Sequence, residues 1–311
     1  MLDLILLGTG GGMPIPERGL SAVLLNYKGH KVLVDCGEGT QVSMKICRTG
    51  FKTVDVICIS HWHGDHIVGL PGILATIGNS GRTEPLTIIG PVGIKNIVKG
   101  LTVIVPYLPY ELNIIEVGKD SIAFNYNKNN LFIEKTGDFV INTMEVDHSS
   151  PCVAYSFNVK RRAKFDLEKA IVNQVPKNIW SVLQKGERVE CEGKIYEPFM
   201  VLGEEREGLK FSFVTDTIPL KKLIPFIHKS DLLICEGTYG SDLDLEKAIK
   251  NKHMTFSQAA LLAKEGQVKE LILTHFSTAM ENPEEFLHCA KDIFPNTKIG
   301  KDRMAMTLKF K

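Results

Sequence analysis

The run His61-Trp62-His63-Gly64-Asp65-His66 carries four potential metal ligands within six residues and follows the apolar segment Ile57-Cys58-Ile59. That segment closes an expected buried strand over residues 54–60. Because side chains alternate along an extended chain, a His-x-His pair can aim both rings to one side. Gly64 then permits a sharp turn, which lets Asp65 and His66 face the same point from the first turn of a helix. The run therefore predicts a metal site at a strand end, where α/β proteins place their chemistry.

The number and type of these ligands predict two metal ions. Imidazole and carboxylate groups suit zinc, and they also accept manganese or iron. Four ligands exceed what one tetrahedral ion needs when a position stays open for water. Three further candidates each follow a separate apolar strand: His148, Asp216 and His275. Their shared position just past a strand favours one common site.

Length and composition indicate a soluble globular chain, large enough for one large domain or two modest ones. Of its 311 residues, 44% are hydrophobic and 23% are charged. The longest apolar runs stop far short of the roughly 18 to 20 residues that a membrane span needs, and the acidic Asp3 is not typical of an export signal. The seven cysteines are scattered without a Cys-x-x-Cys pair, which argues against a disulfide framework. We therefore expect a cytoplasmic protein.

The glycine-rich stretch Gly8-Thr9-Gly10-Gly11-Gly12 is only superficially similar to a dinucleotide-binding fingerprint. That fingerprint requires a helix directly after the glycines, whereas Met13-Pro14-Ile15-Pro16 blocks one. We expect these glycines to let the backbone pass close to a site or to a neighbouring strand.

Alternating strand-like and helix-like segments predict an α/β protein with an insertion. One helix is expected over residues 93–105, strands dominate residues 113–157, and residues 210–310 alternate strands with helices. Residues 160–200 break this rhythm. Within them, Lys160 to Lys185 hold seven basic residues against two acidic ones, a local excess of +5. On charge alone, a solvated basic face is the plainer explanation of such a run.

The His-x-His-x-Asp-His run, with the later His, Asp and His at strand ends, resembles the metallo-β-lactamase superfamily. The resemblance covers essentially the whole chain, residues 1–311, and implies a four-layered αββα sandwich with the metals between the sheet edges. Within that superfamily the chain is similar to ribonuclease Z, the endonuclease that removes the 3′ trailer from precursor tRNA. Three blocks carry this similarity: Gly8-Thr9-Gly10, Asp35-Cys36-Gly37-Glu38-Gly39-Thr40-Gln41 and the twelve residues from His61 to Gly72.

The resemblance also implies a role for each matched residue. The ligands implied for one zinc ion are His61, His63 and His148, those for the other are Asp65, His66 and His275, and the bridge is Asp216. Asp65 is also the family's candidate general base. Glu236 and His253 match the pair thought to polarise the scissile phosphate and to protonate the leaving oxygen. Two zinc ions about 3.5 to 4 Å apart would share the hydroxide that attacks phosphorus.

Residues 160–200 resemble the arm with which this family grips the tRNA elbow. Such an arm would contact backbone phosphates without reading base sequence. The candidate contacts are Arg161, Arg162, Lys164 and Lys177. The chain departs from the family pattern at three places: Cys235 replaces the first histidine of His-Glu-Ala-Thr, the loop usually reading Pro-x-Lys-x-Arg-Asn is Pro14-Ile15-Pro16-Glu17-Arg18-Gly19, and the arm lacks its Gly-Pro motif.

Two other functions stay open at this point. One is a small-molecule phosphodiesterase, or another hydrolase of the same superfamily, in which the arm serves a different role. The other is a non-enzymatic, zinc-stabilised RNA-binding or scaffold protein. Asp65, Glu236 and His253 argue against the latter because a purely structural site needs no spare acid and base. Family members are commonly homodimers, so the expected partners are precursor tRNA and a second copy of the chain, with no membrane.

Overall fold

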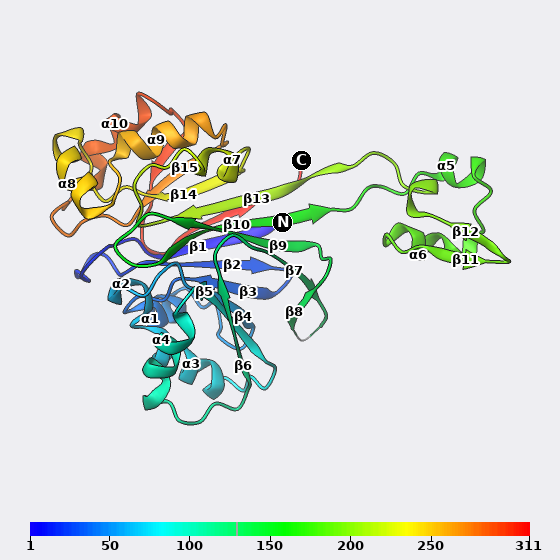
Figure 1. Cartoon of the computed structure of the whole chain (residues 1–311), viewed down its shortest axis with the longest axis horizontal. Helices are drawn as coiled ribbons and strands as arrows, with labels where there is room; N and C mark the ends of the chain where they lie inside the picture. Colours follow the sequence, from blue (N-terminus) through cyan, green and yellow to red (C-terminus); the bar gives the residue numbers. More distant parts are fainter. Residues whose placement is uncertain (129) are drawn as a thin grey trace.

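The computed structural model describes residues 1–128 and 130–311, which form two large mixed sheets packed face to face (Figure 1). In spatial order, the strands of the first sheet are β17 (Met304–Leu308), β1 (Leu2–Gly8), β2 (Ala22–Tyr27), β3 (His30–Val34), β4 (Val54–Cys58), β5 (Leu86–Pro91) and β6 (Leu112–Val117). Those of the second are β16 (Thr297–Ile299), β15 (Leu271–Thr274), β14 (Leu232–Glu236), β13 (Arg206–Val214), β10 (Cys152–Arg161), β9 (Phe139–Val146), β7 (Ser121–Tyr126) and β8 (Leu131–Glu134). Strands β3 to β6 are parallel, as are β13 to β16.

The main hydrophobic core lies between the two sheets. Leu2, Leu4 and Leu6 alternate along β1 and are fully buried, and Phe157 and Phe211 stack from the second sheet with ring centroids 5.4 Å apart. Helices cover the two outer faces. Those over the first sheet are α1 (Thr40–Ile46), α3 (Leu70–Asn79) and α4 (Ile94–Leu101), and those over the second are α7 (Leu223–Ile227), α9 (Phe256–Glu265) and α10 (Leu287–Lys291). The chain therefore has the expected four-layered αββα sandwich fold.

Local sequence explains the elements that matter most for the site. All five residues of β4, Val-Asp-Val-Ile-Cys, are buried, as expected for a parallel strand covered on both faces. Helix α9 begins with a capping box, in which the Thr255 side chain accepts from the backbone N–H of Gln258 and the Gln258 side chain accepts from the backbone N–H of Thr255. Among the described residues, no helix combines the length and the apolar character needed to cross a bilayer.

Some elements differ from the sequence expectation. The helix expected over residues 93–105 is α4, which ends at Leu101 and continues as a single 3₁₀ turn, Thr102–Ile104. The β-branched run before Pro106 explains this end, because the residue preceding a proline disfavours helical backbone. In the stretch expected to alternate strands with helices, α10 is preceded by a separate 3₁₀ turn, Pro283–Phe286. Helix α8 (Leu245–Asn251) was not anticipated.

Strands β10 and β13 carry a small separate unit at their far ends, and Figure 1 shows it standing away from the sandwich. We call residues 163–205 the arm head. Its elements are α5 (Leu167–Val172), a 3₁₀ turn (Lys177–Ile179), α6 (Trp180–Gln184), β11 (Val189–Cys191), β12 (Lys194–Tyr196) and a second 3₁₀ turn (Pro198–Met200). The head has its own apolar cluster, which includes the buried residues Ala170, Leu183 and Val201.

Candidate metal centre and adjoining acid pair

The ligand run of the first sheet begins where β4 ends. The chain passes from Cys58 through His61 and His63 into α2 (Gly64–Ile67), a short helix whose first turn carries Asp65 and His66. His63 is the extended residue that precedes this helix, with φ −65° and ψ 151°. The turn at Gly64 therefore brings the four side chains into one region of the molecule, with His61 and His63 in one ligand group and Asp65 and His66 in another.

Three further side chains reach the same point from the second sheet. Asp216 and His275 follow β13 and β15, whose carboxyl ends meet at one edge because both strands run parallel to β14. His148 lies in the turn between β9 and β10. Asp216 and His275 have φ values of 39° and 60°, which cost of order 1–3 kcal/mol each and persist only where surrounding contacts impose them.

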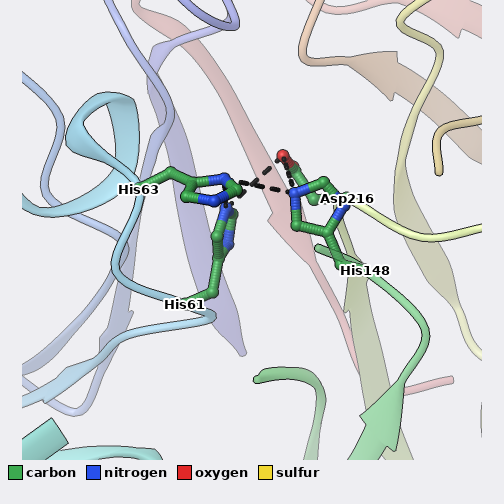
Figure 2. Close-up of side chains that lie close together, drawn as sticks. All are labelled: His61, His63, His148 and Asp216. Carbon is green, nitrogen blue, oxygen red and sulfur yellow. Dashed lines mark hydrogen bonds and ion pairs between the residues drawn. The ribbon is translucent and has the colours of Figure 1, made fainter. Parts of the chain in front are cut away.

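One ligand group comprises His61, His63, His148 and Asp216, drawn in Figure 2. His63 Nδ1 lies 3.1 Å from His61 Nε2 and 3.2 Å from His148 Nε2. Asp216 Oδ2 lies 3.5 Å from His61 Nε2 and 3.6 Å from His148 Nε2. Three imidazole nitrogens and one carboxylate oxygen thus converge on a single small space.

A second ligand group comprises Asp65, His66 and His275, and a third possible group, Asp216, His253 and His275, shares a member with each of the first two. His66 Nε2 lies 3.1 Å from His275 Nε2, and Asp65 Oδ2 lies 3.4 and 3.3 Å from these two nitrogens. Asp216 Oδ1 faces the same pair, at 3.4 Å from His66 and 3.2 Å from His275. The carboxylate of Asp216 therefore presents one oxygen to each group.

The donor set fits divalent ions. Within each group the candidate ligand atoms all lie within 4.8 Å of one another. Several of these close contacts join two imidazole nitrogens, and a neutral imidazole has only one N–H to donate. Cations shared by the converging lone pairs would satisfy all of these nitrogens, and nitrogen with carboxylate oxygen is the ligand chemistry of zinc.

Asp35 is a candidate functional residue that sequence reasoning did not single out. It directly follows β3, is fully buried, and adopts φ 58°. Its Oδ2 accepts from His66 Nδ1 at 2.7 Å and from the Ser60 hydroxyl at 2.8 Å, while Oδ1 accepts from the Ser60 backbone N–H at 2.7 Å. Asp35 therefore orients His66 so that Nε2 faces the site. A buried acid at a strand end was the available signal.

The glycine run serves the close approach that the sequence suggested. The backbone N–H of Gly12 donates to Asp65 Oδ2 at 2.6 Å. A Cβ atom at Gly11 would lie 2.4 Å from the His275 ring. Any side chain at Gly11 would therefore displace either the loop or this ligand.

Glu236 and His253 form an ion pair beside the two ligand groups. Glu236 ends β14 and is fully buried, and both its carboxylate oxygens lie 3.2 Å from His253 Nδ1. Burial alone would lower the pKa of His253, but the Glu236 carboxylate raises it to about 9. Burial alone would raise the pKa of Glu236, and His253 holds it below its usual value. His253 lines a cavity of about 500 Å³ together with His63, His148 and Asp216, and Glu236 lies buried behind it.

Charge is distributed unevenly among the ligand residues. Burial, followed by neighbouring His66, keeps the pKa of His61 well below its ordinary value. Burial alone would lower the pKa of His66, but Asp216 and Asp35 raise it well above that value. Burial would raise the pKa of Asp216, and the surrounding histidines hold it well below its usual range. Asp216 is therefore a carboxylate.

The four predicted substrate contacts lie away from the metal groups, on and beside the arm. Arg162 pairs with Asp138 at 3.0 Å, and the Arg161 guanidinium lies 5.2 Å from the Phe310 ring. Lys164 belongs to the arm head, and Lys177 Nζ lies 6.0 Å from the Trp180 ring. Arg161 and Arg162 thus contact the body of the protein, whereas Lys164 and Lys177 belong to the head.

Two departures from the family pattern have structural explanations. Cys235 is buried in the apolar cluster between the second sheet and α9, because strand alternation turns its side chain to the face opposite that of Glu236. Arg18 donates to the backbone carbonyls of Met280 and Glu281 at 3.0 and 3.2 Å. It therefore ties its loop to the segment that follows His275.

Relatives in two clostridial species match the chain over its full length. A ribonuclease Z of Clostridium tetani (strain Massachusetts / E88) is 70% identical over 310 residues, covering 100% of this chain and 99% of the relative. A ribonuclease Z of Clostridium novyi (strain NT) is 62% identical over 310 residues, covering 100% of both. The family model described as Anti-Pycsar protein Apyc1 matches residues 2–95.

Solved structures give the same picture. The crystal structure of human tRNase Z, short form, has a TM-score of 0.69 and 25% identity, covering 99% of this chain and 100% of that chain. The metallo-beta-lactamase fold protein YhfI from Bacillus subtilis has a TM-score of 0.68 at 19% identity, covering 99% of this chain and 100% of that chain, which shows a shared fold.

Proposed function

The chain belongs to the ribonuclease Z family, and on that premise we propose that it is a metal-dependent endoribonuclease that removes the 3′ trailer from precursor tRNA. One observation carries the proposal. In the cavity beside Asp216, two groups of candidate metal ligands adjoin His253, whose Nδ1 pairs with the buried Glu236 carboxylate, and neither residue belongs to the ligand sets that the resemblance implies for the two ions. Hydrolysis of a phosphodiester needs both components, since a nucleophile must be generated and a leaving oxygen protonated.

We propose that the two groups hold two zinc ions. His61, His63 and His148 would bind one, and Asp65, His66 and His275 the other, with Asp216 shared. Such ions, when bound, activate water as the nucleophile and offset charge that develops on the phosphate. Asp65 would accept a proton from that water, and the N–H of Gly12 holds its carboxylate in place.

His253 would donate a proton to the leaving 3′ oxygen of the tRNA. Glu236 accepts from His253 Nδ1, which fixes the ring and favours its charged form. A group placed beside the metal ligands, rather than among them, can reach the oxygen that departs from phosphorus.

We propose that RNA binds along the inner side of the arm. A cavity of about 1490 Å³ between the arm and the second sheet is lined by basic side chains of both. These include Lys160, Arg161, Arg162, Lys169, Lys185, Lys210, Lys229 and Lys269. Phosphates bound there would lie toward the opposite end of β10 from His148. That strand has 10 residues, so at 3.3 Å per residue it spans about 33 Å.

A second copy of the chain is the proposed protein partner. Exposed apolar side chains lie on or just after α1, α2 and α4: Val42, Ile46, Val68, Val103, Ile104 and Tyr107. Such a surface is typical of a protein contact. All seven cysteines are free, which supports a cytoplasmic, reducing setting.

The test uses zinc-loaded protein with precursor tRNA and, in parallel, with bis-p-nitrophenyl phosphate. Release of an intact trailer, leaving a 3′ hydroxyl on the tRNA, is the expected result. Cleavage of the small ester alone would instead identify a small-molecule phosphodiesterase. No cleavage of either substrate by fully loaded protein would leave the non-enzymatic alternative. An Asp216→Asn preparation controls for contaminating nucleases.

A further inference from the structure

The hydroxyl of Thr238 lies among three groups to which the proposed mechanism gives separate tasks. Its Oγ1 is 2.6 Å from Glu236 Oε2, 3.0 Å from His275 Nδ1 and 3.2 Å from His253 Nδ1. Thr238 is buried in the loop that follows β14, two residues beyond Glu236. A single hydroxyl thus contacts both the proposed metal ligand His275 and the ion pair of Glu236 and His253.

The direction of these hydrogen bonds follows from their chemistry. A hydroxyl has one proton to donate, and an ionised carboxylate only accepts. Thr238 therefore donates to Glu236, its nearest neighbour, and accepts from His275. His275 Nδ1 must then carry the ring proton, so Nε2 keeps the lone pair that a metal requires.

The Glu236 carboxylate is held firmly enough to act at this distance. The backbone N–H of Thr217 donates to Oε1 at 2.7 Å, and that of Met254 donates to Oε2 at 3.1 Å. These two bonds come from different loops and fix the plane of the carboxylate. Two hydrogen bonds to the carboxylate therefore remain when the Thr238 hydroxyl is removed.

We propose that Thr238 is a positioning residue through which Glu236 orients His275, so that one carboxylate supports both a metal ligand and the proton donor. The second ligand group would then have a carboxylate behind each of its histidines: Asp35 directly behind His66, and Glu236 through Thr238 behind His275. The inference rests on the proposed metal site but not on the identity of the RNA substrate.

The test compares Thr238→Val with Thr238→Ser. Valine keeps the shape of threonine and removes the hydroxyl, whereas serine keeps the hydroxyl. We expect Thr238→Val to weaken binding of the zinc ion at Asp65, His66 and His275 by about 10- to 100-fold, the usual effect of removing a hydrogen-bond partner behind a ligand. Binding at the other group should stay unchanged, and Thr238→Ser should restore wild-type affinity.

Zinc affinities are read by titrating metal-free protein against a chromophoric chelator that resolves the two binding steps, without RNA. Thr274→Val, which replaces a buried threonine one residue before His275, controls for loss of a buried hydroxyl. Thermal unfolding of each metal-free variant checks the fold. If both zinc dissociation constants of Thr238→Val equal those of the wild-type protein, the inference is overturned. Equal weakening of both ions with no recovery in Thr238→Ser would also overturn it, because that pattern indicates a general packing defect. Failure to cleave tRNA would bear on the proposed function only.

Discussion

At the scale of single residues, Asp216 distinguishes this cavity from two independent metal sites. Its Oδ2 faces His61 and His148, while Oδ1 faces His66 and His275. The positive φ of Asp216 shows that the backbone is held in an uncommon conformation to make this possible. Loss of this side chain should therefore weaken metal binding at both ligand groups.

We predict that Asp216→Ala loses both ions and that His63→Ala loses mainly one, because His63 belongs to a single group. Both variants should lose nearly all hydrolysis. Zinc content per chain after gel filtration, measured by atomic emission, checks the first part. Full metal content with normal turnover in either variant would contradict the ligand assignment.

His253 gives a prediction about the leaving group. His253→Ala should retain both ions, while cleavage of precursor tRNA falls by roughly 10²- to 10⁴-fold, the usual contribution of a positioned general acid. Bis-p-nitrophenyl phosphate releases p-nitrophenolate, which departs without protonation, so its hydrolysis should be much less affected. The measurement is the ratio of the two losses in one preparation of known zinc content. Equal losses would assign His253 to the phosphate or to the fold.

Asp35 gives a prediction about metal affinity. In Asp35→Asn the side chain keeps its shape and tolerates the left-handed backbone, but it is a weaker acceptor for His66 Nδ1. We expect zinc affinity to fall by about 10- to 100-fold while the fold is kept. Isothermal titration of metal-free protein measures this change. Unaltered affinity would show that His66 needs no such partner.

At the scale of elements, the arm carries its charge unevenly. The basic excess in the sequence includes Lys160, Arg161 and Arg162, which lie where β10 leaves the sheet. The arm head itself, residues 163–205, has six basic and eight acidic residues, a net charge of −2. The positive charge is therefore concentrated where the arm meets the body, in the cavity described above.

This distribution predicts which arm lysines matter for RNA. Replacing Lys160 and Lys185 by alanine should weaken precursor tRNA binding and reduce its salt dependence, since a protein that contacts fewer phosphates releases fewer counterions from the RNA when it binds. Replacing Arg188 and Lys194 on the β11–β12 side of the head serves as a control of equal charge and should change binding little. Filter binding over a range of salt concentrations gives the slopes. If affinity had the same slope against salt concentration in the two double variants, RNA would not bind in this cavity.

At the scale of the whole molecule, a buried charge cluster joins the two sheets at the start of β4. Asp55 accepts from Arg82 at 2.8 Å and pairs with His30 at 2.6 Å, and the side chains of Asp55 and Arg82 are fully buried. The backbone N–H of Leu131, on β8 of the second sheet, also donates to Asp55. The cluster lies at the opposite end of β4 from the metal ligands.

We predict that Arg82→Met lowers the free energy of unfolding by about 3–5 kcal/mol, because it leaves the Asp55 carboxylate buried without its guanidinium. Zinc affinity of the folded protein should be unchanged. Urea unfolding of metal-free protein provides the measurement. Lys247→Met removes the exposed pair with Asp244 and should cost less than about 1 kcal/mol. A similar loss in both variants would mean that the buried cluster is not a structural support.

The sequence by itself determined which residues could serve as metal ligands and where each stood on its strand. The spacing of His61, His63, Asp65 and His66 is local information, and strand alternation with one turn at Gly64 suffices to predict their convergence. The positions of His148, Asp216 and His275 at strand ends were equally visible. Their roles beside particular ions came from the family resemblance, since spacing along the chain does not fix distance between strands.

Only the tertiary structure decided which residues are the hydrogen-bond partners of the candidate ligands. Asp35 and His66 are 31 residues apart, and Thr238 and His275 are 37 apart, so their hydrogen bonds depend on how the strands are ordered in the two sheets. For the same reason, the basic run of the sequence divides between the end of β10 and the arm head, whose net charge is −2. Charge counted over the basic run alone does not reveal what the rest of the head adds. The acidic residues that follow the run within the head offset its lysines: Glu187, Glu190, Glu192, Glu197, Glu204 and Glu205.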